Sequence, residues 1–196
     1  MKFLKVILTC AGLIIGWRHE LYPVYGPGGE VLLAMERCAT PLFGVVTFGV
    51  HMTVYVPPTA FQPMRIWTPR RSTEKPTYPG MLDNTVPLVE MYLIKVAGGI
   101  AYNVSVLDTL VKESEEEASL PPDLVRSQAV AAGAVSYFYV RESSAGGEVG
   151  LLQPEVQYVY DLAVPEDVVP KPNDDEVESF SLMPLHEVNV ILHRLM

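Results

Sequence analysis

The stretch VKESEEEASLP, residues 111–121, places four glutamates almost side by side in a chain that is 49% hydrophobic. On a helix, Glu113, Glu116 and Glu117 stand three and four positions apart, so their carboxylates project from one face while Glu115 points elsewhere. Three neighbouring carboxylates repel one another unless they share a cation, and such oxygen ligands suit Mg²⁺ or Mn²⁺ better than zinc. The spacing alone fits two structures, a solvated acidic helix face and a metal site.

A helix is predicted around these glutamates. Apolar residues recur at helical spacing from Leu107 to Ala118, and Ser105 or Asp108 is a suitable N-cap. The two prolines at 121 and 122 would end the helix. The glutamates therefore belong to a regular helix with one apolar side, and that side must pack against another element.

The rest of the chain predicts the element against which this helix packs. Short β-prone segments broken by turn residues precede and follow the helix, which indicates an α/β (α+β) fold with helices packed on a mixed sheet. The segments are a hairpin at 20–37 turning at 26–29, strands within 42–56, 134–142 and 156–164, a strand-like segment after 176, and helices at 122–130 and 185–196.

Composition excludes some classes of function. The net charge of −9, from 14 Lys and Arg against 23 Asp and Glu, argues against binding to nucleic acid through phosphate contacts and favours a small-molecule partner. The only cysteines, Cys10 and Cys38, form neither a disulfide framework nor a CxxC zinc pair. We expect one domain, 16–196, of unknown oligomeric state.

Residues 1–15 form an apolar leader. Two lysines precede the mostly apolar run 6–15, which outlines a signal peptide but is too short for a comfortable membrane span. We expect no stable membrane span and a cytoplasmic location. Secretion, and an imperfectly placed start codon in a gene model, stay open as alternatives.

The segment AGGIAYNVSVLDTLVKESEEEASLP resembles the Nudix hydrolase signature G-x5-E-x7-R-E-U-x-E-E-x-G-U, where U is apolar. Its glutamates match Glu113, Glu116 and Glu117, and its opening glycine matches Gly98, with Gly99 beside it. Lys112 stands at the position of the arginine, and Ser119 replaces the second glycine.

The signature is weakest between its opening glycine and the helix. Asn103 and Val104 occupy positions where a glycine and a glutamate are usual. The segment 87–95 also separates LDNTV from VAGGI like an insertion, and family members carry further sequence at both ends. These departures predict weaker metal binding or a truncated domain, and they leave open a Nudix-fold binding module without turnover.

Other segments resemble one Nudix branch, the enzymes related to, and in some fungi fused with, thiamine pyrophosphokinase. They include GWRHELYPVYG, RIWTPRRSTEKPTYPGMLDNTV, LLQPEVQYVYDLAVP and DDEVESFSLMPLHEV. The resemblance implies a mixed β-sheet sandwiched between helices. It also implies Mg²⁺-dependent hydrolysis of a small-molecule diphosphate, with oxidatively damaged thiamine diphosphate or oxidised nucleoside diphosphates such as 8-oxo-dGDP as substrates.

The resemblance also assigns roles. It implies Glu113, Glu116 and Glu117 as metal ligands, and one of them, or Glu176 from the later acidic loop, as the base for the attacking water. The basic segment offers a cradle for a diphosphate, and the glycines and lysine of the signature have structural roles. The predicted residues are Arg70, Arg71 and Lys75 for substrate, and Gly98, Gly99 and Lys112 for structure.

The segment RRSTEKPTYPGM is also similar to isomerases of isopentenyl diphosphate. That reaction usually needs a catalytic cysteine near this segment, and Cys10 and Cys38 are poorly placed for it. The sequence therefore favours the hydrolase.

Overall fold

The computed structural model describes residues 17–74, 80, 82, 96–141 and 149–195. The leader 1–15, Lys75 and the segment 87–95 lie outside the described residues. No helix among the residues it describes is long and apolar enough to cross a membrane.

The centre of the fold is strand β3 (Thr47–Val56), which pairs with three other strands. It runs parallel to β7 on one side, and on its other side it pairs antiparallel first with β5 and then, at its last two residues, with β4. The mixed sheet has the order β6-β7-β3-β4-β8, with β5 beside β3. The remaining strands are β4 (Arg65–Arg71), β5 (Val96–Gly99), β6 (Val130–Val140), β7 (Leu152–Ala163) and β8 (Val177–Pro184).

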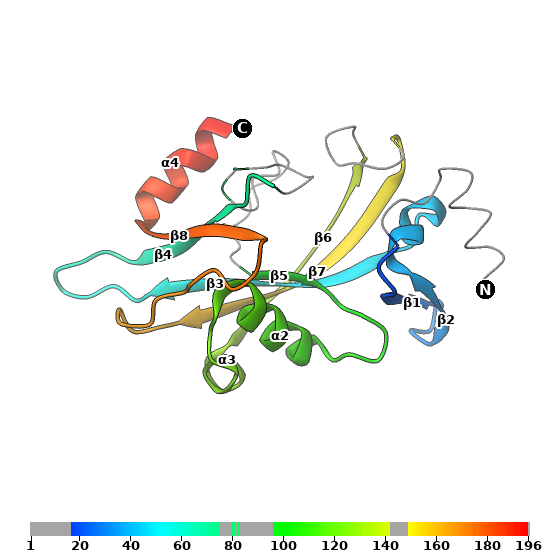
Figure 1. Ribbon diagram of the computed structural model, residues 1–196, viewed down its shortest axis with the longest axis horizontal. Coiled ribbons are helices and arrows are strands. Elements are labelled where there is room, and N and C mark those ends of the chain that lie inside the picture. The colour runs from blue at the N-terminus through cyan, green and yellow to red at the C-terminus, as the bar shows by residue number, and fades with distance from the viewer. Residues whose placement is uncertain (1–16, 75–79, 81, 83–95, 142–148, 196) are drawn as a thin grey trace.

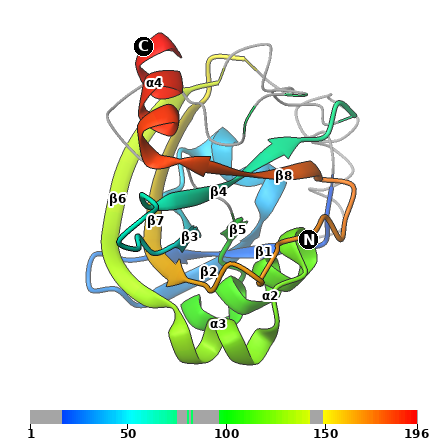
Figure 2. The same cartoon turned by 90° about the vertical axis from the view of Figure 1, so that its left-hand side faces the viewer.

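Helices lie on both sides of this sheet. Helices α2 (Val106–Ala118) and α3 (Pro122–Gln128) lie on one side, and α4 (Leu185–Leu195) contacts β4 and β8 on the other (Figures 1 and 2). The predicted α+β class, a mixed sheet sandwiched between helices, is confirmed.

Helix α2 is held against β3 by an apolar core. Val50, Met52 and Val54 alternate along β3, so their side chains share one face of the sheet, and each is at most 1% exposed. Leu110 and Ala118 of α2 pack into the same cluster. Because the apolar side of α2 is buried there, the glutamates on its remaining surface have a fixed position over β5.

A separate hairpin stands next to the sheet. Strands β1 (Leu21–Tyr25) and β2 (Val31–Glu36) pair antiparallel, and the 3-10 helix η1 (Arg37–Phe43) follows them. Gly29, at φ 82°, makes the turn, which confirms the predicted hairpin. The hairpin is joined to the segment after β5, where the Tyr102 N–H donates to the Leu21 carbonyl at 2.7 Å.

The predicted helix boundaries agree with the structure except at two ends. The Ser105 hydroxyl accepts from the Asp108 N–H at 3.0 Å, so Ser105 is the N-cap of α2. Helix α2 ends at Ala118, before the prolines, and α3 ends at Gln128, because Val130 already belongs to β6. Strands β4 and β5 were not predicted, since prolines and glycines interrupt their alternation.

Two departures from the Nudix signature share a backbone property. Asn103 (φ 63°) and Ser119 (φ 52°) are both left-handed, and both stand where the signature or its usual context has glycine. Asparagine tolerates this conformation better than most residues, whereas serine has no such advantage. Each substitution therefore keeps the turn and adds strain to it.

Replacing Ser119 by glycine should remove that strain. We expect Ser119→Gly to raise the free energy of unfolding by about 1 kcal/mol, because glycine adopts the left-handed C-cap without the Cβ penalty. Ser119→Ala, which retains the Cβ, should give no comparable gain. Urea unfolding of the three proteins measures the difference, and equal effects of both substitutions would contradict this explanation.

His51 on β3 makes the stability of the fold depend on pH. Its side chain is 7% exposed, its Nδ1 lacks a hydrogen-bond partner among the described residues, and burial lowers its pKa from 6.5 to about 4. Between pH 6.5 and 4, His51 is therefore protonated in the unfolded chain and neutral in the folded chain. Stability present above pH 6.5 should be lost as the pH falls to 4, by up to about 1.4 kcal/mol per pH unit.

The variant His51→Leu isolates this contribution. Unfolding free energies measured between pH 4 and 7 should fall less steeply in His51→Leu than in the wild type, because the variant has no imidazole to protonate. Parallel slopes would show that His51 does not titrate differently in the two states.

Candidate metal and diphosphate site

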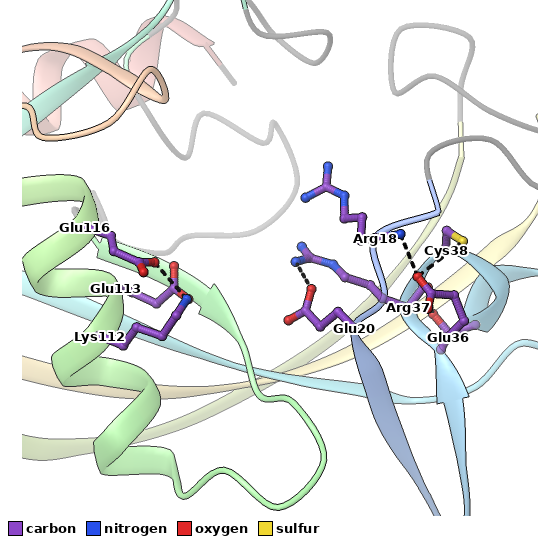
Figure 3. A network of polar contacts seen from close by, with 9 residues as sticks. Arg18, Glu20, Glu36, Arg37, Cys38, Lys112, Glu113 and Glu116 are labelled. Carbon is purple, nitrogen blue, oxygen red and sulfur yellow. Dashed lines mark hydrogen bonds and ion pairs between the residues drawn. The ribbon is translucent and has the colours of Figure 1, made fainter.

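Two of the predicted ligands meet at one ammonium group. Lys112 Nζ lies 3.2 Å from Glu113 Oε1 and 2.7 Å from Glu116 Oε2 (Figure 3). The hydrogen bond to Glu116 raises the pKa of Lys112. The carboxylates of Glu113 and Glu116 thus face the same cation, as the three-residue spacing on the helix predicts.

Glu113 occupies space that Gly98 leaves open. A Cβ at Gly98 would overlap the Cγ and Cδ of Glu113, so the structural role predicted for this glycine has a direct geometric basis. The Glu113 side chain is only 18% exposed, and burial raises its pKa, while Lys112 acts in the opposite direction. A second positive charge near this carboxylate would offset its lost hydration.

Glu117 points to the same strand by a different contact. It is 8% exposed, and one of its oxygens accepts from the Ala97 N–H at 3.1 Å. Among the residues the structure describes, no three acidic, histidine or cysteine side chains gather closely enough to hold a metal ion. A common ion bound by Glu113, Glu116 and Glu117 stays a prediction.

The side chain of Tyr22, from the hairpin, packs against strand β5. A Cβ at Gly99 would overlap the hydroxyl of Tyr22, which is 4% exposed. Gly98 and Gly99 follow one another on a strand, so their Cα–H groups face opposite sides of the sheet. The two glycines therefore admit Glu113 from α2 on one side and Tyr22 from β1 on the other.

The ring of Tyr22 packs against the guanidinium of Arg37. The Arg37 guanidinium carbon lies 5.4 Å from the centre of the Tyr22 ring, and its Nη1 lies 3.0 Å from Glu20 Oε2. Figure 3 shows Arg37 and Glu20 on the side of the hairpin that faces Lys112, Glu113 and Glu116. Sequence reasoning missed Tyr22 and Arg37, because they lie far from the signature and only the fold places them beside it.

Glu155 on β7 is a further acid that sequence reasoning missed. It accepts from the Tyr137 hydroxyl at 2.8 Å and from Gln157 Nε2 at 3.0 Å. Burial raises the pKa of Tyr22, and the charges of Glu113 and Glu155 both add to that shift. A glutamate inside a strand-like segment was the only signal for it in the sequence.

The predicted substrate arginines lie at the end of β4. Arg70 Nη1 donates to the Gly80 carbonyl at 2.9 Å, and Arg71 pairs with Val177 in the register of β4 and β8. They belong to a strand in the structure. Their contact with substrate stays a prediction.

The loop that carries Glu176 joins this end of β4 to the glutamate helix. The Ser72 N–H donates to the Glu176 carbonyl at 3.0 Å, and Asn173 Nδ2 donates to the Glu115 carbonyl at 3.0 Å. The backbone thus brings Glu176 to the neighbourhood of α2. Its role as a base stays a prediction.

The residues present fit a hard divalent cation. Glu113 and Glu116 already face one cationic group, Gly98 leaves room for the Glu113 side chain, and carboxylate oxygens are the donors that Mg²⁺ prefers. Mg²⁺ would be held by Glu113 and Glu116. The Lys112 ammonium would then lose its present contacts with these two carboxylates.

Comparison with known proteins agrees with this geometry. The family model described as "NUDIX domain" matches residues 50–195, which include the whole glutamate helix. The chain belongs to the Nudix family. Nudix hydrolase 20, chloroplastic, of Arabidopsis thaliana is 39% identical over 189 residues, which cover 96% of this chain and 45% of that protein. Nudix hydrolase 24, chloroplastic, of the same plant is 37% identical over 187 residues, covering 94% and 46%.

This Nudix chain spans about half the length of the curated relatives it matches. Among solved structures, DR0079 from Deinococcus radiodurans has a TM-score of 0.57 at 15% identity, covering 89% of this chain and 90% of that one. The NUDIX domain of Shewanella oneidensis NrtR, solved with ADP ribose, has a TM-score of 0.52 at 13% identity, covering 76% and 79%. At these identities the two structures support the fold alone.

Gly98 offers a test of the site of this Nudix protein. Gly98→Ala should force the Glu113 carboxylate away from Lys112, because the new Cβ would overlap the Cγ and Cδ of Glu113. We expect Mn²⁺ affinity, measured by isothermal titration calorimetry, to fall about tenfold or more, a loss of the size seen when a ligand's support is removed. Gly28→Ala is the control, since its Cβ would meet only the mobile end of Glu30. Unchanged Mn²⁺ affinity in Gly98→Ala would show that Glu113 is not a ligand.

Proposed function

We propose that this Nudix protein is a Mg²⁺-dependent hydrolase that cleaves a diphosphate linkage. The observation that carries the proposal is the pair Glu113 and Glu116, whose carboxylates both contact the Lys112 ammonium. The pair lies over β5, where Gly98 leaves room for the Glu113 side chain. The hydrolase names of the two Arabidopsis relatives support the reaction class.

The reaction needs charge neutralisation and an aligned water. Water forms a new bond to one phosphorus, the bridging P–O bond breaks, and the leaving phosphate takes the electrons of that bond. When bound, Mg²⁺ would neutralise charge on the phosphate oxygens and lower the pKa of a water. Glu116, the more exposed carboxylate, is suited to bind the ion, and Lys112 to restore the balance of charge beside it.

The proton of the attacking water needs an acceptor. Glu176 is our candidate, because Glu113 and Glu116 are assigned to the ion and the loop of Glu176 is hydrogen-bonded to both β4 and α2. Tyr22 is buried beside β5 with its pKa raised, so it stays neutral and can donate a hydrogen bond.

For the substrate we propose oxidatively damaged thiamine diphosphate, with oxidised nucleoside diphosphates such as 8-oxo-dGDP as a broader class. The support is the resemblance of the segments around the site to Nudix enzymes related to thiamine pyrophosphokinase. The strand segment QPEVQYVYDLAV, which contains Glu155, is one of them and lies in β7 next to β3.

A binding module without turnover is the second candidate. Val104 stands where the signature has its first glutamate, so one carboxylate of the usual set is missing. The position is 39% exposed. The isomerase has less support, because the Cys38 thiol lies 3.8 Å from Glu36 on the hairpin and beyond Arg37 as seen from α2 (Figure 3).

Phosphate release decides between these candidates. Wild-type protein with Mg²⁺ should release phosphate from oxo-thiamine diphosphate, and more slowly from thiamine diphosphate or 8-oxo-dGDP. Glu116→Gln should lower kcat at least about 100-fold, because it removes a ligand charge of the metal site. Glu115→Gln, a neutralisation on the same helix outside the Lys112 pair, should leave kcat within about twofold. Absence of turnover in the wild type would favour the binding module.

A further inference from the structure

Two arginines before the family-matched region face the glutamate helix. Arg18 and Arg37 belong to the hairpin segment, while the NUDIX match begins at residue 50. Figure 3 shows both side chains on the side of the hairpin turned towards Lys112, Glu113 and Glu116. The site thus has carboxylates on one side and guanidinium groups on the other.

Arg37 is fixed in position by contacts that use only some of its N–H donors. Its Nη1 donates to Glu20 at 3.0 Å, its backbone N–H donates to the Glu20 carbonyl at 2.8 Å, and its guanidinium lies over the Tyr22 ring. Glu20 is its only side-chain hydrogen-bond partner among the described residues. A guanidinium has five N–H donors, one of which pairs with Glu20, and the Arg37 side chain is 41% exposed, so donors remain for a ligand.

Arg18 has an anchored backbone and an exposed head. Its N–H donates to Glu36 Oε1 at 2.8 Å, and the Cys38 thiol contacts the same oxygen. Its guanidinium makes no ion pair with any described residue. An exposed guanidinium next to Arg37 extends the positive side of the site.

The negative charge of the site makes positively charged groups necessary for binding a diphosphate. A diphosphate approaching Glu113 and Glu116 is repelled by both, and the chain as a whole carries −9. Lys112 belongs to α2 and lies beside both glutamates, so its positive charge is on the same side of the site as their negative charges. Burial acts to lower the pKa of Arg37, but the hydrogen bond to Glu20 and the charges of Glu20 and Glu113 help to raise it overall. The Arg37 guanidinium and the Glu113 carboxylate are therefore close enough to interact electrostatically.

We propose that Arg37, with Arg18 beside it, binds the phosphate oxygens of the diphosphate that face away from α2. The inference rests on the proposed diphosphate hydrolysis and adds substrate-binding residues outside the region that the family model matches. The planar guanidinium suits paired phosphate oxygens in a way that lysine does not. Glu20 and Tyr22 act as positioning residues, because they fix the guanidinium of Arg37.

Binding of methylenebisphosphonate, a diphosphate analogue that water cannot cleave, tests the inference without turnover. Calorimetry in Mg²⁺ should show affinity about 10- to 100-fold lower in Arg37→Ala, as expected for the loss of hydrogen bonds to a charged group. Arg37→Lys should recover only part of the loss, and Arg18→Ala should show a smaller one. KM for the diphosphate substrate should rise in the same order, while Mn²⁺ affinity stays within about twofold of wild type because no ligand is removed.

Arg126→Ala is the matched control. Arg126 is an arginine of similar exposure whose Nη2 pairs with Asp108 at 2.7 Å, outside the site, so analogue binding should not change. Wild-type affinity in both Arg37→Ala and Arg18→Ala, with turnover intact, would overturn the inference and leave the hydrolase proposal standing. A wild type that neither binds the analogue nor hydrolyses a diphosphate would overturn both. Arg18→Ala covers the case in which Arg37→Ala fails to fold.

Discussion

Electrostatic repulsion between glutamates over one short strand is the constraint on which the rest of the structure depends. Glu113 and Glu117 both reach β5, one at Gly98 and the other at the Ala97 N–H, and Glu116 stands beside them. Such a set is unfavourable when partly buried unless cations and N–H donors surround it. Lys112 meets this need from the helix itself, and Arg37 adds positive charge from the hairpin.

Packing of the sheet makes that arrangement possible. The apolar alternation of β3 buries α2, and the antiparallel pairing of β3 with β5 fixes Gly98 and Gly99 under it. Because adjacent residues of a strand face opposite sides, the two glycines accept Glu113 from the helix and Tyr22 from the hairpin. One four-residue strand thus joins the Nudix helix to a segment that precedes the family-matched residues.

Much of this fold could be predicted from the sequence, and the reasons are local. The N-cap Ser105, the helical spacing of the apolar residues and the glycines of the hairpin each act over a few residues, so periodicity and turn chemistry reveal them. The contacts of Lys112 with Glu113 and Glu116 have the same local origin, because the three residues lie within about one turn of the helix. Strands β4 and β5 escaped prediction because proline and glycine hide their alternation. Tyr22, Arg37 and Glu155 were not predicted, because only the tertiary fold brings the Tyr22 hydroxyl to Gly99, places Arg37 over the Tyr22 ring and puts Glu155 near enough to act on Tyr22.

The most direct test of a divalent-cation site on α2 is a crystal of the wild-type protein soaked in Mn²⁺ and measured at the manganese absorption edge. We expect an anomalous peak within about 2.3 Å of carboxylate oxygens of Glu113 and Glu116, with the Lys112 ammonium displaced from between them. A peak elsewhere, or none with Lys112 still bridging the two glutamates at saturating Mn²⁺, would contradict it.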